Sequence, residues 1–126
     1  MFRAKRVDNG EWVYGGYWLN STATRDTANI IDSDGNTHGV IPETIGQYIG
    51  CTQKNGAKIF EGDIVLAGYG QHKCVVAWDE ECARFIYHVT DKPCIIVCTS
   101  MYNKDNQSVL SVIGNIHDNP ELIKVK

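Results

Sequence analysis

The sequence predicts a mainly β protein that is built from antiparallel hairpins and has few short helical turns. Twelve glycines and three prolines among 126 residues give a turn-rich balance, as expected of a chain with many short strands. Apolar stretches rich in aromatic and β-branched residues alternate with turn-forming dipeptides, and no window of a dozen residues has a helical period. With a hydrophobic share of 43%, the chain is expected to form one domain over residues 1–126.

The N-terminal region, residues 2–51, is predicted to consist of hairpins. A turn at Asp8-Asn9-Gly10 joins the first two strands, and Gly15-Gly16 indicates a bulge or bend inside the second, because paired glycines weaken a regular strand. Residues 20–27 are polar and aperiodic, which favours a loop, and Pro42 can begin a single helical turn. The predicted strands are residues 2–7, 11–19, 28–32, 37–41 and 46–51.

Two backbone reversals stand close together at the start of the second region, residues 52–126. Asn55-Gly56 is a strong hairpin signal, because both residues tolerate the positive φ of a type I′ turn. In Glu61-Gly62-Asp63 the glycine supplies the turn conformation, and the Asp63 carboxylate can bond to nearby backbone. These five residues are predicted to have a structural role.

The rest of the second region is predicted to hold further short strands. A tight turn at Gly62-Asp63 that is followed by short strands suits a small closed sheet, which has no free edges. We expect the two regions to depend on one another. The predicted strands are residues 63–67, 74–79, 83–90, 95–99 and 109–117, with a polar loop at 100–108 and a terminal helical turn at 119–122.

Five stretches that follow one another along the chain carry a family pattern, at residues 2–4, 40–50, 54–65, 75–79 and 112–122. In these stretches the chain resembles the YopX family of phage and prophage proteins. Ala57 stands where a charged residue is common, and residues 20–36 have no counterpart in the pattern. The resemblance implies a β-rich fold with an SH3-like barrel in the part that begins at Asp63, and a phage or prophage origin. It supplies no catalytic motif that transfers to this chain.

Charge and hydropathy bear on location and partners. The formal net charge is −3, which argues against a nucleic-acid surface spread over the whole protein. No segment approaches the roughly 18 apolar residues of a membrane span, and the N-terminus lacks the apolar stretch of a secretion signal. We therefore expect a cytoplasmic protein of a bacterial host cell, with its five cysteines reduced.

No metal site or cofactor is expected. Cys94 and Cys98 share a face if they lie on a strand, but at about 3.3 Å per residue they stand about 13 Å apart. Both could not bind one tetrahedral ion with bonds of about 2.3 Å. Cys51, Cys74 and Cys82 belong to no tight pair, so most of the cysteines are interpreted as small buried apolar residues.

The sequence favours a protein without catalysis. The histidines lie far apart and in no ligand motif, at positions His38, His72, His88 and His117. Two enzymatic alternatives remain. One is a nucleophile pair of Cys82 and His88, and the other is a small hydrolase that uses Asp63, Asp79 and a histidine. The preferred interpretation is that Asp63 organises a turn, whereas Asp79-Glu80-Glu81 is a solvated hairpin tip. Gly68-Tyr69-Gly70 lacks the helix and the lysine of a phosphate loop.

An aromatic strand is the candidate interaction element, with Trp12, Tyr14, Tyr17 and Trp18. Packing in the core or between subunits is the preferred interpretation, and exposed members would suit a protein–protein interface. We expect a homo-oligomer, because open sheets tend to cover their edges, and an unidentified protein partner. Nucleic-acid binding is the alternative. It requires a shared basic face, such as one made by Arg3, Lys5, Arg6 and Arg25.

Overall fold

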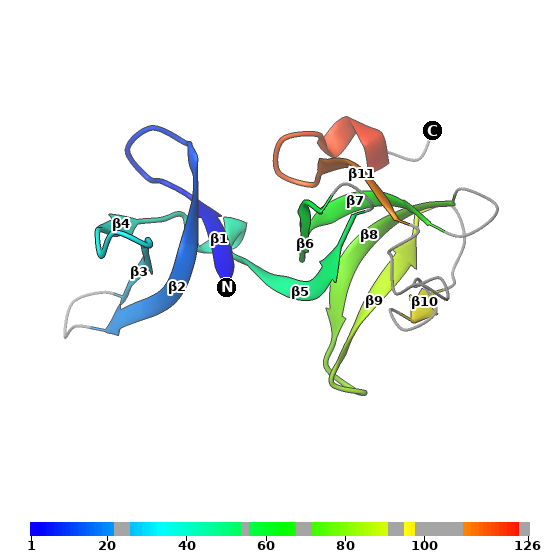
Figure 1. The fold of residues 1–126 in the computed structure, drawn as a ribbon, viewed down its shortest axis with the longest axis horizontal. Helices are drawn as coiled ribbons and strands as arrows, with labels where there is room; N and C mark the ends of the chain where they lie inside the picture. Colours follow the sequence, from blue (N-terminus) through cyan, green and yellow to red (C-terminus); the bar gives the residue numbers. More distant parts are fainter. Residues whose placement is uncertain (22–25, 54–55, 68–71, 91–94, 98–109, 124–126) are drawn as a thin grey trace. The chain divides into compact units, whose positions relative to one another are not determined.

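The computed structural model is a mainly β structure with short 3-10 turns (Figure 1). It describes residues 1–21, 26–53, 56–67, 72–90, 95–97 and 110–123. The chain divides into two compact units, Met1–Tyr48 and Ile49–Lys126. This division falls within three residues of the boundary expected from the sequence. Among the described residues, no helix is long and apolar enough to cross a membrane.

The N-terminal unit is an antiparallel sheet with the strand order β4-β3-β2-β1-β5. Strand β5 crosses the division and has β6 as its neighbour in the C-terminal unit. The predicted hairpins and the helical turn at Pro42 are confirmed. The elements are β1 (Phe2–Lys5), β2 (Trp12–Ser21), β3 (Asp26–Ile31), β4 (Thr37–Gly39), η1 (Pro42–Thr44) and β5 (Gly46–Thr52).

Strand β2 changes its partner at the glycine pair. Its first part pairs with β1 as far as Gly15, which faces Phe2, and its second part pairs with β3 from Gly16, which faces Ile31. A Cβ atom on Gly15 would lie 1.9 Å from the carbonyl oxygen of Ile31, so only glycine fits there. The predicted bend is thus a close approach of two strands, for which a residue without Cβ is required.

The loop predicted for residues 20–27 is wrong at both of its ends. Asn20 pairs with Thr27 and Ser21 pairs with Asp26, so the hairpin of β2 and β3 continues through these polar residues. Cross-strand pairing, which a single chain segment does not reveal, overrides the low strand preference of Asn and Asp. Residues 22–25 lie outside the described part of the chain.

The core of the N-terminal unit lies on one side of its sheet. Its buried residues are Ala4, Ala28, Ile30 and Val40, with Phe2, Val13 and Ile45 packed against them. Thr44 ties η1 to β1, because its hydroxyl accepts a hydrogen bond from the Lys5 amide at 2.8 Å. The segment after β4 thereby covers one sheet face.

The C-terminal unit contains a five-stranded antiparallel sheet with the order β10-β9-β8-β7-β11. Pairing among the described strands leaves β10 and β11 at the two edges, so a closed SH3-like barrel is not confirmed. One core fills this unit, with Cys51, Ile59, Val65, Cys74, Val76, Tyr87, Val89 and Leu110. The elements are β6 (Lys58–Phe60), β7 (Asp63–Ala67), β8 (His72–Asp79), β9 (Arg84–Val89), β10 (Ile95–Val97), β11 (Ser111–Asn115) and η3 (Pro120–Ile123).

The last predicted strand is shorter than residues 109–117, since β11 ends at Asn115. The Asn115 side chain accepts hydrogen bonds from the amides of His117 and Asp118 and so begins a turn. This local competition of an asparagine side chain with the strand explains the early end. The loop predicted for residues 100–108 lies outside the described residues.

Candidate binding surfaces

The sheet face opposite the N-terminal core holds aromatic and basic side chains together. Side chains alternate between the two faces of a strand, and the register pairs Lys5 with Trp12 and Arg3 with Tyr14. Phe2 and Ala4, which alternate with them on β1, belong to the core side. We call Arg3, Lys5, Trp12, Tyr14 and Trp18 the outer face.

Trp12 lies close to both cations of the outer face. The Arg3 guanidinium carbon is 4.6 Å and the Lys5 ammonium nitrogen 5.5 Å from the centre of its ring. These distances are within the range of cation–π attraction. Arg3 is only 7% exposed, whereas Lys5 is partly exposed. Trp12 therefore holds two positive charges in place along β1.

Two further aromatic side chains of the outer face are open to solvent. Tyr14 is 46% exposed and Trp18 is 47% exposed, so neither packs in the core of this chain, and packing between subunits stays a prediction. Tyr17 is 40% exposed but points to the core side, where its ring lies 5.7 Å from that of Phe2. The four aromatic residues therefore do not form one cluster, since Tyr17 lies on the opposite face.

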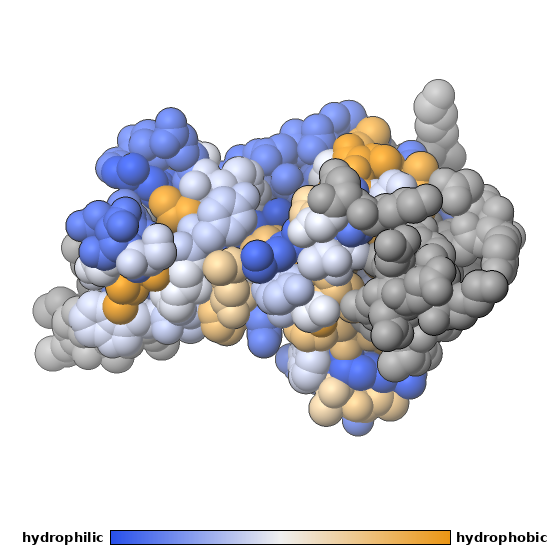
Figure 2. All heavy atoms as spheres, viewed as in Figure 1, coloured by the Kyte–Doolittle hydropathy of each residue, from blue (hydrophilic) through white to orange (hydrophobic). Residues whose placement is uncertain are grey.

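The outer face is free of carboxylates within the described part of β1 to β4. Its other outward positions with described side chains on β2 to β4 are neutral, namely Gly16, Asn29, Ile31, Thr37 and Gly39. Ile31 is 38% exposed and lies across from Gly16, beside the aromatic side chains. Figure 2 shows the visible side of β2 to β4 as a mostly polar surface with small apolar patches. The chain as a whole is acidic, so the positive charge of this face is local.

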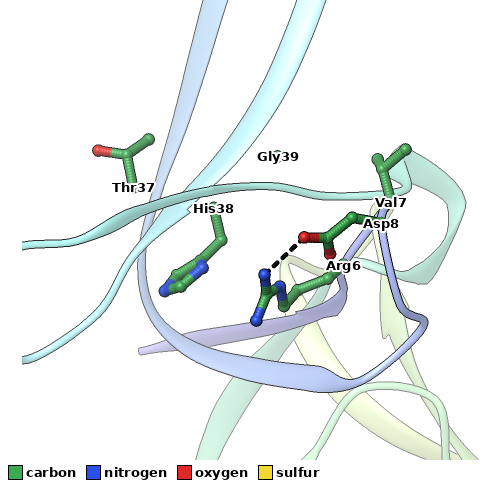
Figure 3. Close-up of a pocket in the computed structure, with 6 residues that line it drawn as sticks. All are labelled: Arg6, Val7, Asp8, Thr37, His38 and Gly39. Atoms are coloured by element: carbon green, nitrogen blue, oxygen red, sulfur yellow. Dashed lines mark hydrogen bonds and ion pairs between the residues drawn. The ribbon is translucent and has the colours of Figure 1, made fainter.

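A second candidate site is a polar pocket of about 220 Å³ beside the first hairpin turn. It is lined by Arg6, Val7, Asp8, Thr37, His38 and Gly39. Figure 3 shows the Arg6 guanidinium between the carboxylate of Asp8 and the ring of His38. Arg6 Nη2 lies 2.6 Å from Asp8 Oδ2, and this hydrogen bond lowers the pKa of the Asp8 carboxyl group.

His38 is held by Asp32, which also organises the neighbouring turn. His38 Nε2 lies 2.8 Å from Asp32 Oδ2, and the amides of Asp34 and Asn36 each donate to Asp32 Oδ1 at 2.9 Å. These bonds lower the pKa of Asp32, the contact with His38 most of all. Arg6 and His38 thus each lie against a carboxylate, so the arrangement is explained by turn structure and does not require a ligand.

The structure does not bring the predicted acidic residues together. Asp63 is 2% exposed, and its carboxylate accepts a hydrogen bond from the Phe60 amide at 2.8 Å, as a turn residue should. Gly62 donates to the carbonyl of Val76, which places Asp79 three residues, or about 10 Å, further along β8. The side chain of Asp79 lies 3.4 Å from Arg84, whereas Glu80 and Glu81 are exposed.

Both turn glycines have the positive φ that the sequence predicts for them. Gly56 and Gly62 have φ of +89° and +92°, and Asn55 lies outside the described residues. The Gly62 carbonyl accepts from the Ile116 amide at 2.9 Å, so the turn joins β8 to the C-terminal segment. Two of the stretches that match the YopX family, residues 54–65 and 112–122, therefore meet at Gly62. A contact in the fold accounts for this part of the family resemblance.

Cysteine and histidine side chains show no cluster that could hold a metal ion within the described part of the chain. Cys51 and Cys74 are buried, Cys82 is exposed, and Cys94 and Cys98 lie outside the described residues. His88 is four residues, or about 13 Å, beyond Arg84, and Cys82 lies past Arg84 in the opposite direction. The geometry therefore does not support the Cys82–His88 pair.

Sequence reasoning missed one exposed aromatic residue in the C-terminal unit, Trp78. Trp78 is 43% exposed and pairs across the hairpin of β8 and β9 with Phe85, the two rings lying 4.8 Å apart. Trp78 alternates with the buried Cys74 and Val76, so the apolar side of this hairpin extends beyond its covered part. The alternation of side chains from residue 74 to residue 78 places Trp78 on the same strand face as Cys74 and Val76, and this pattern can be read from the sequence.

Fold and surfaces together define a two-unit antiparallel β protein with an exposed aromatic sheet face. The chain belongs to the YopX protein family, whose sequence model matches residues 1–124. A similar fold occurs in the crystal structure of protein EF1440 from Enterococcus faecalis, with a TM-score of 0.53 and 22% sequence identity. That match covers 98% of this chain and 96% of the other. No curated protein matches this sequence.

Proposed function

We propose that this protein acts by binding a macromolecular partner through its outer face, without catalysis. The proposal includes a role as an accessory protein of phage or prophage origin, located in the cytoplasm of the host cell. Membership of the YopX family and the order of the matching stretches support the phage association. For the C-terminal unit, its single core and antiparallel sheet support the proposed SH3-like barrel.

One observation favours the outer face over the other surfaces. Tyr14 and Trp18 are both nearly half exposed on a sheet face whose opposite side is occupied by the core. Large aromatic side chains are enriched at interaction sites, because they bring much contact area and lose little conformational freedom on binding. The polar pocket has no comparable argument, since none of its described lining residues is Trp, Tyr or Phe.

Site-specific photo-crosslinking tests this proposal. A photoreactive phenylalanine analogue replaces Tyr14 in one variant and Trp78 in a matched control of similar exposure. Both proteins are expressed in bacterial cells that carry the phage or prophage. We expect a discrete crosslinked macromolecule from position 14 that differs from any product at position 78, where a second copy of the chain is the expected product. The absence of crosslinks at position 14, or an identical product from both positions, would contradict the proposal.

A further inference from the structure

We propose that the ligand of the outer face is a single-stranded nucleic acid, an inference that rests on the proposed function. The outer face combines two solvent-exposed aromatic side chains with two held cations. Bases stack on aromatic side chains whatever their sequence, and basic groups along the same surface attract the backbone phosphates.

Tyr14 and Trp18 are the stacking residues in this arrangement. Each has close to half of its surface exposed, and their separation by four positions corresponds to about 13 Å along β2. The outer face continues for two residues to Trp12, which gives a length of about 20 Å. At about 3.4 Å per stacked nucleotide, this length holds about six nucleotides, which is within the range of about 4 to 16 nucleotides that an OB fold binds.

Trp12 has a positioning role in this proposal. Its ring lies against Arg3 and Lys5, so it fixes the two charges beside the stacking residues. Lys5 is partly exposed and can reach a phosphate, whereas the nearly buried Arg3 contributes its positive charge from below the surface. Charge complementarity therefore selects an anionic ligand for this face, although the whole chain has a net charge of −3.

Single strands fit this surface better than a duplex or a second copy of the chain. In a duplex the bases are stacked on each other, and their flat faces are not available to Tyr14 and Trp18. Binding to a duplex also depends on many phosphate contacts, and this face offers two cations. A second copy would bring the same two cations to the interface, so like charges would meet across it in a self-complementary contact.

Fluorescence anisotropy with an end-labelled oligothymidylate of about twelve nucleotides tests the inference, first at about 20 mM salt and then at rising salt concentrations. We expect binding by the whole protein and a loss of at least tenfold in affinity for the double variant Tyr14→Ala/Trp18→Ala. The control Trp78→Ala should bind like the unchanged protein. Lys5→Glu should weaken binding, and the slope of log K against log salt should lie between about −0.7 and −1.4, as for one or two phosphate contacts.

Circular dichroism confirms that each variant is folded before binding is compared. The absence of binding at 20 mM salt, equal binding by the double variant, or equal affinity for a duplex would each overturn the inference. Oligouridylate of the same length decides between RNA and DNA as the preferred single strand. If position 14 crosslinks to a protein and oligonucleotides do not bind, the proposed function stands and this inference fails.

Discussion

Replacement of Gly15 by alanine should destabilise the N-terminal unit far more than the same change at the next residue. A Cβ on Gly15 would lie 1.9 Å from Ile31 O and 2.8 Å from Ile31 C, and both are backbone atoms that no side-chain rotation can move away. The two strands must therefore separate by more than 1 Å. Such overpacking costs about 1–3 kcal/mol, and one disturbed backbone hydrogen bond adds about 0.5–1.5 kcal/mol.

We thus expect Gly15→Ala to lower the free energy of unfolding by about 2–4 kcal/mol. At about 2.1 cal/mol/K per residue, this corresponds to a melting temperature that is roughly 8–15 °C lower. Urea and thermal unfolding, followed by circular dichroism and tryptophan fluorescence, measure both quantities. The matched control is Gly16→Ala, since nothing lies within 4 Å of a Cβ at that position. Equal stability of the two variants would refute the assignment of Gly15 as the point of close approach.

The remaining predictions concern a turn, an ion pair and self-association. Gly62→Val should cost more than about 1 kcal/mol, because a β-branched residue resists φ of +92°; an unchanged unfolding midpoint would contradict this. Asp32→Asn should lower stability at pH 7, and the difference should shrink as the pH falls below about 4. The pKa of Asp32 is lower in the folded state, so its contribution is present above the unfolded pKa of about 3.9 and is lost in acid. Light scattering coupled to size-exclusion chromatography should show a homo-oligomer that Trp78→Glu dissociates, whereas a monomer at all concentrations would exclude self-association.

Most strand positions could be predicted because apolar runs and glycine turns coincide along this chain. Asp63 is an example, because its position after Gly62 predicts a carboxylate that bonds to the backbone of a turn. In the structure this carboxylate accepts a hydrogen bond from the Phe60 amide. The polar ends of β2 and β3 could not be predicted locally. Asn20 and Thr27 become strand residues through their pairing with each other, and this register is a property of two segments.

The outer face was predictable in part. Alternation along β2 separates Tyr17 from Trp12, Tyr14 and Trp18, and the sequence alone contains that information. The position of the cations depends on the pairing of Lys5 with Trp12, which is set by the turn between β1 and β2. A shift of one residue in that register would place Arg3 and Lys5 on the core side. The composition therefore shows an acidic chain, and only the paired strands show a local basic surface.

Gly15 connects the fold of the N-terminal unit to this surface. Because Gly15 pairs with β1 and Gly16 with β3, strand β2 changes partners while its side chains continue to alternate. Tyr14 and Trp18 consequently stay on one face although they belong to differently paired parts of the strand. A Cβ at Gly15 would push β3 away from β2 and move Trp18 relative to Tyr14. A lower free energy of unfolding and weaker oligonucleotide binding should therefore occur together in Gly15→Ala, whereas Gly16→Ala should show neither effect.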